Sequence, residues 1–137
     1  MLSQSIINDI AYEAVGCAIT VHREMGPGLL EQIYEECLYE EMKSHGIQVA
    51  RQVKIPISFK GRILKKQLRI DLLVEDLVII ECKSVQQIMP IFEAQLLTYL
   101  KLAKKPKGFL INFNCRNLSK EGLLPMVTDQ FSSYPKE

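Results

Sequence analysis

The sequence predicts an α/β sandwich in which helices flank a mixed central sheet. Three observations support this fold class. Residues 5–44 carry apolar side chains at helical spacing, residues 47–83 change to the alternation typical of strands, and residues 88–113 read as a helix followed by a short buried strand. Because a helix between two strands of one sheet makes a right-handed crossover, the last strand should lie parallel to an earlier one.

The two N-terminal helices are indicated by apolar spacing and by glycine. One face of residues 5–25 collects five apolar side chains, namely Ile6, Ile10, Ala14, Cys17 and Val21. Gly26-Pro27-Gly28 interrupts this pattern, so the first helix should end there and a second should run from about residue 29 to residue 44. Gly46 follows, as expected of a residue that caps a helix C-terminus.

The next segment predicts three strands joined by two tight turns. Residues 47–59 alternate apolar and polar side chains, which favours a strand with one buried face. Lys60-Gly61 and Glu75-Asp76 are the turns into the second and third strands, expected over residues 62–74 and 77–83. Consecutive strands joined in this way form an antiparallel meander.

The pattern weakens toward the C-terminus. We expect a helix over residues 88–104 and a buried strand over residues 108–113. Residues 123–127 are a candidate edge strand, and residues 128–137 are expected to form a flexible tail. The chain of 137 residues should make one domain, because that length is sufficient to bury a single core.

Composition narrows the class of protein. The net charge is +1 and no apolar run approaches the ~18 residues of a membrane helix, so the whole chain indicates neither a polyanion partner nor a bilayer. The four cysteines form no CxxC pair, as is typical of reduced thiols in a cytoplasmic protein. Zinc is not expected, because His22 and His45 have no ligand at short spacing. We expect both histidines at the surface or at helix caps.

Three charged residues stand in strands that are otherwise apolar. Asp71 lies on the second strand, and Glu81 and Lys83 lie on the third. Because strand side chains alternate, Glu81 and Lys83 should point the same way, ~6.6 Å apart, while Cys82 points into the opposite layer. In a hairpin, Asp71 can join them on that face. An ion pair at the sheet rim is the simpler interpretation, but burying three charges is costly unless they pair or hold a metal.

This order of residues resembles the PD-(D/E)xK nuclease superfamily. Asp71 and the run Glu81-Cys82-Lys83 stand at the positions of its motif, followed by a helix and a strand. Residues 28–34, GLLEQIY, resemble the signature of the GxxExxY family within that superfamily, and Gln95 and Tyr99 resemble its QxxxY helix. The likeness covers about residues 5–113. Ile70 stands where the superfamily's name has proline, a position that carries no chemistry.

The resemblance implies a restriction-endonuclease-like fold and a nuclease that depends on Mg²⁺ or Mn²⁺. Asp71, Glu81 and Lys83 would be catalytic, with Glu31 as an auxiliary group. The metal would be held by four oxygen donors, namely Asp71, Glu81, the backbone carbonyl of Cys82, and Glu31. Three further side chains would contact a carboxylate or the substrate phosphate, namely Gln95, Tyr99 and Tyr34. A bound ion activates water and polarises a phosphoryl oxygen, and Lys83 would add a compact positive charge.

The expected partner is nucleic acid, with DNA as the expected substrate. Lys65 and Arg69 share a face with Asp71 by strand parity, so their cations could bind phosphate beside the site, without regard to base sequence. A homodimer or a partner protein remains an option, because a small core has limited grip on a duplex. The alternative function is a non-catalytic module that keeps this fold and binds nucleic acid or a partner. A Cys-His nucleophile fits poorly, because Cys82 should face the other layer.

Overall fold

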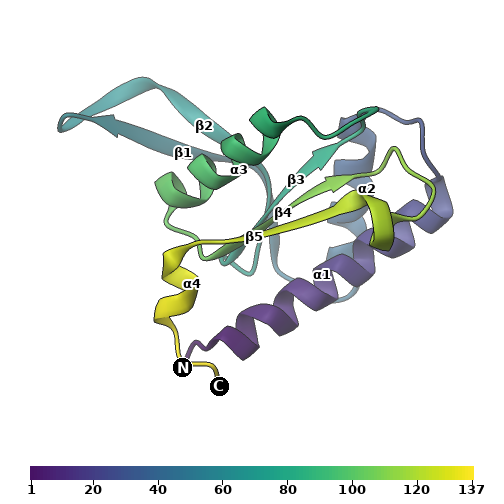
Figure 1. Cartoon of the computed structure of the whole chain (residues 1–137), viewed down its shortest axis with the longest axis horizontal. Helices are drawn as coiled ribbons and strands as arrows, with labels where there is room; N and C mark the ends of the chain where they lie inside the picture. Colours follow the sequence, from purple (N-terminus) through teal and green to yellow (C-terminus); the bar gives the residue numbers. More distant parts are fainter.

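The computed structural model describes all residues from 1 to 137 as a five-stranded sheet between two layers of helices (Figure 1). The strands are β1 (Val49–Phe59), β2 (Arg62–Val74), β3 (Val78–Lys83), β4 (Lys107–Asn112) and β5 (Leu123–Val127), in that order across the sheet. The parallel pair is β3–β4, and the other neighbours are antiparallel. The predicted mixed sheet, with its meander and its parallel crossover strand, is therefore confirmed.

Each face of the sheet has its own core. Helices α1 (Gln4–Met25) and α2 (Glu31–Ser44) cover the face that carries Val78, Ile80 and Cys82. Helix α3 (Pro90–Ala103) covers the face that carries Ile79. The alternation expected of β3 therefore holds, and Cys82 faces the α1–α2 layer, away from Glu81.

Both predicted turns adopt left-handed backbone conformations. The φ angles are 50° at Lys60 and 79° at Gly61, and 51° at Glu75 and 58° at Asp76. Two successive positive φ angles characterise the type I′ turn, whose twist matches that of paired strands. The meander therefore has short connections at both ends of β2.

Part-way along the β1–β2 hairpin, the side of each strand that faces the α1–α2 core turns to face the α3 core. Val49 packs in the α1–α2 core whereas Val53, four residues later on the same side by parity, packs in the α3 core. The residue between them with unusual backbone geometry is Gln52, whose φ is 51°. On β2 the same exchange separates Ile70, in the α3 core, from Leu72, in the α1–α2 core. Simple parity from Asp71 to the outer part of β2 therefore fails.

Beyond this exchange the hairpin projects from the body of the molecule (Figure 1). Its end is exposed on both faces, with Phe59 60% and Ile63 70% accessible. The long, half-buried strand predicted for residues 47–59 is therefore buried only along its inner part. The physical reason is that neither helical layer extends over the outer hairpin.

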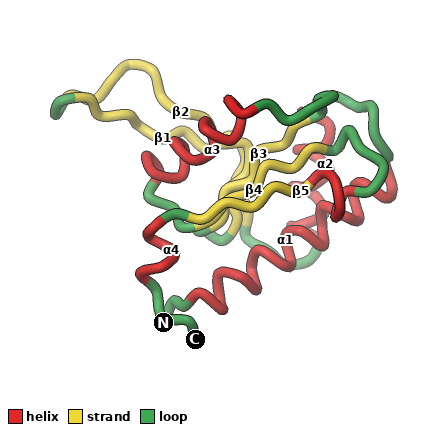
Figure 2. The backbone as a smooth tube through the Cα atoms, in the orientation of Figure 1, coloured by secondary structure: helices red, strands yellow, loops and turns green.

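The C-terminus is ordered against the start of α1, contrary to the flexible tail expected for residues 128–137. A short helix, α4 (Asp129–Ser133), follows β5, and a single π-helical turn, η1 (Leu118–Gly122), precedes β5. The N–H groups of Gln4 and Ser5 donate to the carbonyls of Pro135 and Lys136, at 2.7 and 3.0 Å. The first N–H groups of a helix have no partner within it, and the tail supplies acceptors. The two termini consequently lie side by side (Figure 2).

The two histidines differ from one another. His22 is buried, 8% exposed, and its Nε2 lies 2.8 Å from the carbonyl oxygen of Cys115, so the expectation of a surface or capping role for it was wrong. The last turn of α1 faces the segment after β4, which covers the ring. His45 is exposed at the end of α2, as expected. None of the helices is long and apolar enough to cross a membrane.

Candidate active site

The candidate site lies where β2 and β3 separate. Their ladder runs from Val74↔Val78 to Leu72↔Ile80 and stops there. At the next position two side chains replace backbone acceptors: the Cys82 N–H donates to Asp71 Oδ2 at 2.9 Å, and the Asp71 N–H donates to Glu81 Oε2 at 2.8 Å. This reciprocal exchange satisfies both N–H groups and holds the two carboxylates against each other in the opening between the strands.

Proximity and burial perturb both acids. Glu81 is 7% exposed, and burial followed by repulsion from Asp71 raises its pKa well above the ordinary range. Burial is also the main cause that raises the pKa of Asp71, with the Glu35 carboxylate adding to it and the Cys82 N–H opposing it. A buried carboxylate and a half-buried one that repel each other form a site that favours a cation.

Lys83 supplies positive charge beside this pair. Its side chain follows Glu81 on the same face of β3, and its Nζ lies 4.6 Å from the centre of the Phe92 ring on α3. The ammonium lowers the pKa of both Asp71 and Glu81, although less than burial raises them. The structure therefore brings together the three residues of the predicted motif.

Glu35 is a third carboxylate at this site, itself buried, that the sequence reasoning missed. It is 4% exposed, and it accepts hydrogen bonds from Arg51 Nε at 3.1 Å and Gln52 Nε2 at 2.8 Å. The same Gln52 amide lies 3.5 Å from Asp71 Oδ1, so it links the two acids. Glu35 stands four residues after Glu31, and this helical spacing was the available signal.

Tyr34 holds the loop that precedes α2. The ring is fully buried and stacks on Phe113 with centroids 4.5 Å apart. Its hydroxyl donates to the Gly26 carbonyl and accepts from the Leu29 N–H at 3.1 Å. Gly28, at φ 102°, makes the left-handed bend between these contacts. Tyr34 thus uses its hydroxyl within the loop, and it acts on the site by positioning α2.

Glu31 is the first residue of α2, and its side chain lies beside the end of β3. It makes no hydrogen bond to Asp71 or Glu81. Its Oε2 accepts from the Ser84 N–H at 3.2 Å, and Ser84 Oγ donates to the Leu29 carbonyl at 2.6 Å. Glu31 and Ser84 line a surface pocket together with Leu29, Leu30 and Gln32. The segment that resembles G-x-x-E-x-x-Y therefore fastens the start of α2 to the end of β3.

Gln95 and Tyr99 lie on the α3 side of the site. The Gln95 amide donates to the Tyr99 hydroxyl at 2.9 Å. Burial raises the pKa of Tyr99, and the negative charges of Glu81 and Asp71 raise it further. The contact of Tyr99 with a carboxylate or with substrate phosphate stays a prediction.

The donor set fits a hard divalent cation. Asp71 and Glu81 are oxygen ligands whose mutual repulsion a cation would relieve. The N–H and C=O of one strand residue point to the same side. The Cys82 N–H points at Asp71, so the Cys82 carbonyl also points toward the opening. The donors expected on β2 and β3 thus converge.

Lys65 and Arg69 lie on the outer hairpin. Together with Lys54 and Lys66 they line a surface pocket, whose other residues are Gln67 and Leu68. Arg69 alternates with the buried Ile70, so its side chain points away from the α3 core. The faces of β2 exchange between Ile70 and Leu72, so the predicted face shared with Asp71 stays a prediction. Four cations gather around one concave surface.

The fold is of the restriction-endonuclease-like type, with acidic residues and a lysine at the separation of its middle strands. The chain belongs to the PD-(D/E)XK nuclease superfamily, whose family model matches residues 8–123. Members of this superfamily are typically nucleolytic and generally use divalent metals such as Mg²⁺.

Among solved structures, the crystal structure of SSO0001 is similar in fold, with a TM-score of 0.51 and 20% sequence identity. The similarity covers 70% of this chain and 48% of that one, so this chain spans about half the length of SSO0001. No curated protein matches the sequence.

Proposed function

We propose that this protein is a divalent-metal-dependent nuclease that hydrolyses phosphodiester bonds, with DNA as its substrate. The observation that carries the proposal is the reciprocal hydrogen bonding of Asp71 and Glu81 beside Lys83. A purely structural sheet would have no reason to place two repelling carboxylates, one of them buried, where its ladder ends. A phosphodiester-cleaving site needs such a pair to hold its metal.

Each residue has a role in this proposal. Asp71, Glu81 and the Cys82 carbonyl would hold Mg²⁺ or Mn²⁺, whose chemistry when bound would be to activate water and to polarise the phosphoryl oxygen. Lys83 stabilises the negative charge that develops on the phosphate. Tyr99, oriented by Gln95, donates to a carboxylate or to the phosphate.

The acids of α2 complete the carboxylate set. Glu35 is linked to Asp71 through the Gln52 amide, which keeps Asp71 in place for the metal. Glu31 has one oxygen on the Ser84 N–H, and its second oxygen is available as the auxiliary ligand toward substrate or metal. We assign the chain to the GxxExxY branch of the superfamily because Gly28, Glu31 and Tyr34 cooperate in fastening this helix.

The outer hairpin supplies the cations that bind the phosphates of nucleic acid. Residues 53–70 contain six cations and no acid, in a chain of net charge +1. They are Lys54, Lys60, Arg62, Lys65, Lys66 and Arg69. Contacts from these side chains to phosphate would be salt-sensitive and would not read the base sequence. A second copy of the chain or a partner protein would extend these contacts along a duplex.

The test is cleavage of supercoiled plasmid, linear duplex and single-stranded DNA in Mg²⁺ and in Mn²⁺. Wild type is compared with Lys83→Ala and with Lys120→Ala, which removes an exposed lysine on η1. We expect metal-dependent cutting by wild type and Lys120→Ala, and a loss of about a hundredfold or more in Lys83→Ala. Folded wild type that binds DNA without cutting any of the three substrates would overturn the nuclease and support the binding module instead.

A further inference from the structure

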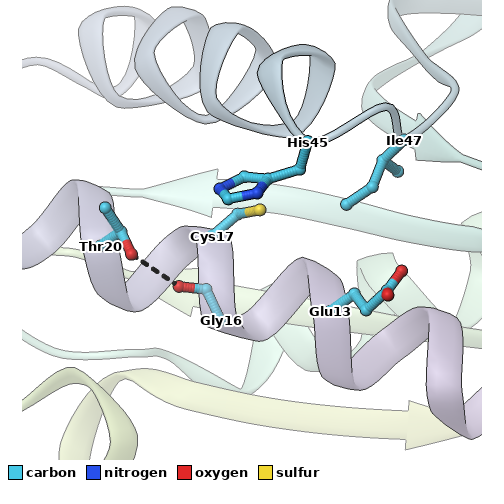
Figure 3. Close-up of a pocket in the computed structure, with 6 residues that line it drawn as sticks. All are labelled: Glu13, Gly16, Cys17, Thr20, His45 and Ile47. Carbon is cyan, nitrogen blue, oxygen red and sulfur yellow. Dashed lines mark hydrogen bonds between the residues drawn. The ribbon is translucent and has the colours of Figure 1, made fainter.

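A second cluster of potential metal ligands lies at the other end of α2. Cys17 on α1, Glu41 on α2 and His45 just after α2 each offer one ligand atom, and these atoms all lie within 4.8 Å of one another. Figure 3 shows the Cys17 sulfur and the His45 ring facing each other across the two helices. They border a pocket of about 250 Å³ that Glu13, Gly16, Thr20 and Ile47 also line.

The spacing of these residues explains why they meet. Glu41 and His45 are four residues apart, so they lie one above the other on the same side of the α2 terminus. Glu13 and Cys17 have the same spacing on α1. Two such pairs on facing helices are an arrangement that places ligands around one point in helical proteins. Glu13 is exposed and lines the pocket, so it is free to rotate toward the other three.

The environment favours a cation. His45 Nε2 lies 2.7 Å from Glu41 Oε2, which orients the imidazole next to the thiol. Cys17 is only 5% exposed, and its sulfur lies together with ligand atoms of Glu41 and His45. A metal ion bound there would take the place of the thiol proton, which would pass to solvent, and would leave a thiolate ligand.

We propose that Cys17, Glu41 and His45 form a second metal site that binds a zinc-like divalent cation, with Glu13 or water as its fourth ligand. Sulfur and imidazole donors select Zn²⁺ and Co²⁺ over Mg²⁺, which prefers oxygen alone. The site is distinct from the carboxylate site, because the 14 residues of α2 separate their two ends by ~20 Å. It joins α1 to the end of α2.

The proposed site departs from an expectation drawn from the sequence. His45 has no Cys or His ligand nearby along the chain, which argued against zinc. The partner that the argument lacked is Cys17, twenty-eight residues earlier, which helix packing places beside it. Glu41, four residues before His45, supplies the carboxylate oxygen at short spacing.

The test uses Co²⁺ as an optical probe and Zn²⁺ as the competitor, with excess Mg²⁺ present to occupy the carboxylate site. We expect one Co²⁺ per chain with the near-ultraviolet absorption of a thiolate–cobalt bond, displaced by equimolar Zn²⁺. Cys17→Ser should abolish the band. Cys37→Ser, which alters a half-buried cysteine on α2, should retain it. His45→Gln, a change at an exposed residue, should weaken Zn²⁺ binding at least tenfold without unfolding the protein.

Two results would overturn the proposal. One is the absence of a thiolate–cobalt band in folded wild type, and the other is a band that survives in His45→Gln with unchanged affinity. Glu81→Gln separates this site from the nuclease proposal, because the band must persist in that variant. Loss of cleavage with retention of the band, or the reverse, therefore tells the two sites apart.

Discussion

The opening between β2 and β3 and the outer β1–β2 hairpin are both rich in charge, yet they use it in opposite ways. In the opening, the half-buried Asp71 lies against the buried Glu81, and the pKa values of both rise. On the outer hairpin, which projects from the body of the molecule, residues 53–70 contain six cations and no acid. The two regions are continuous, because β2 runs from one into the other.

The difference teaches that burial, more than the number of charges, sets what a charged group can do. Buried groups feel each other strongly, so removing one changes both stability and chemistry. Exposed cations are screened by water and salt, and they contribute small and roughly similar increments to the attraction of a polyanion. The two regions meet on β2 between Ile70 and Leu72, where the faces of the strand exchange.

The largest effect should come from Glu81→Gln. This change removes a buried charge, so we expect cleavage to fall a hundredfold or more while the metal-free protein becomes more stable at pH 8, by roughly 1–3 kcal/mol. Activity assays and urea unfolding monitored by circular dichroism measure the two quantities. A variant that is both inactive and destabilised would contradict the assignment of Glu81 as a buried acid whose charge destabilises the metal-free fold.

The pH dependence has a defined sign. The folded-state pKa of Glu81 is raised, so between about pH 4, where the unfolded carboxyl titrates, and the raised value the folded state holds more protons. Stability of metal-free wild type should therefore fall as pH rises through that window, and the fall should be smaller in Glu81→Gln. Adding Mg²⁺ should restore stability more at high pH, because the ion competes with protons.

A smaller and graded effect is expected from the hairpin. Replacing Lys54, Lys65, Lys66 and Arg69 by Gln should reduce the steepness of log K against log salt by about 3 to 4, and it should lower DNA affinity at low salt at least tenfold. Fluorescence anisotropy with labelled duplex measures both. The matched control replaces four cations elsewhere, Lys43, Lys101, Lys120 and Lys136. Equal losses in the two variants would show that net charge, and not the hairpin, attracts DNA.

The smallest effect should come from Tyr34→Phe, which tests a buried residue that carries no charge. The change leaves the Leu29 N–H and the Gly26 carbonyl without their partner, so we expect a loss of roughly 1–3 kcal/mol in unfolding free energy. Denaturant midpoints measure it, and Tyr12→Phe, at an 81% exposed position, is the neutral control. Metal affinity should change little. A loss of metal binding without a loss of stability would contradict this positioning role and would show that Tyr34 acts directly at the metal site.

Local patterns predicted most of the fold. Alternation placed Glu81 and Lys83 on one face of β3 and Cys82 on the other, and two turn sequences bounded β2 correctly. Such features depend on neighbours in the chain, so they can be read from it. The ordered C-terminus was missed because its partners, Gln4 and Ser5, lie more than a hundred residues away.

The sequence by itself determined the order of the elements and the three residues Asp71, Glu81 and Lys83, because period and turn chemistry act over a few residues. Only the tertiary structure decided which acids join them. The bend at Gln52 turns β1 so that the Gln52 side-chain amide links Glu35 to Asp71. The packing of α1 on α2 brings Cys17 to His45. These meetings depend on how whole elements pack, since each joins groups from different elements.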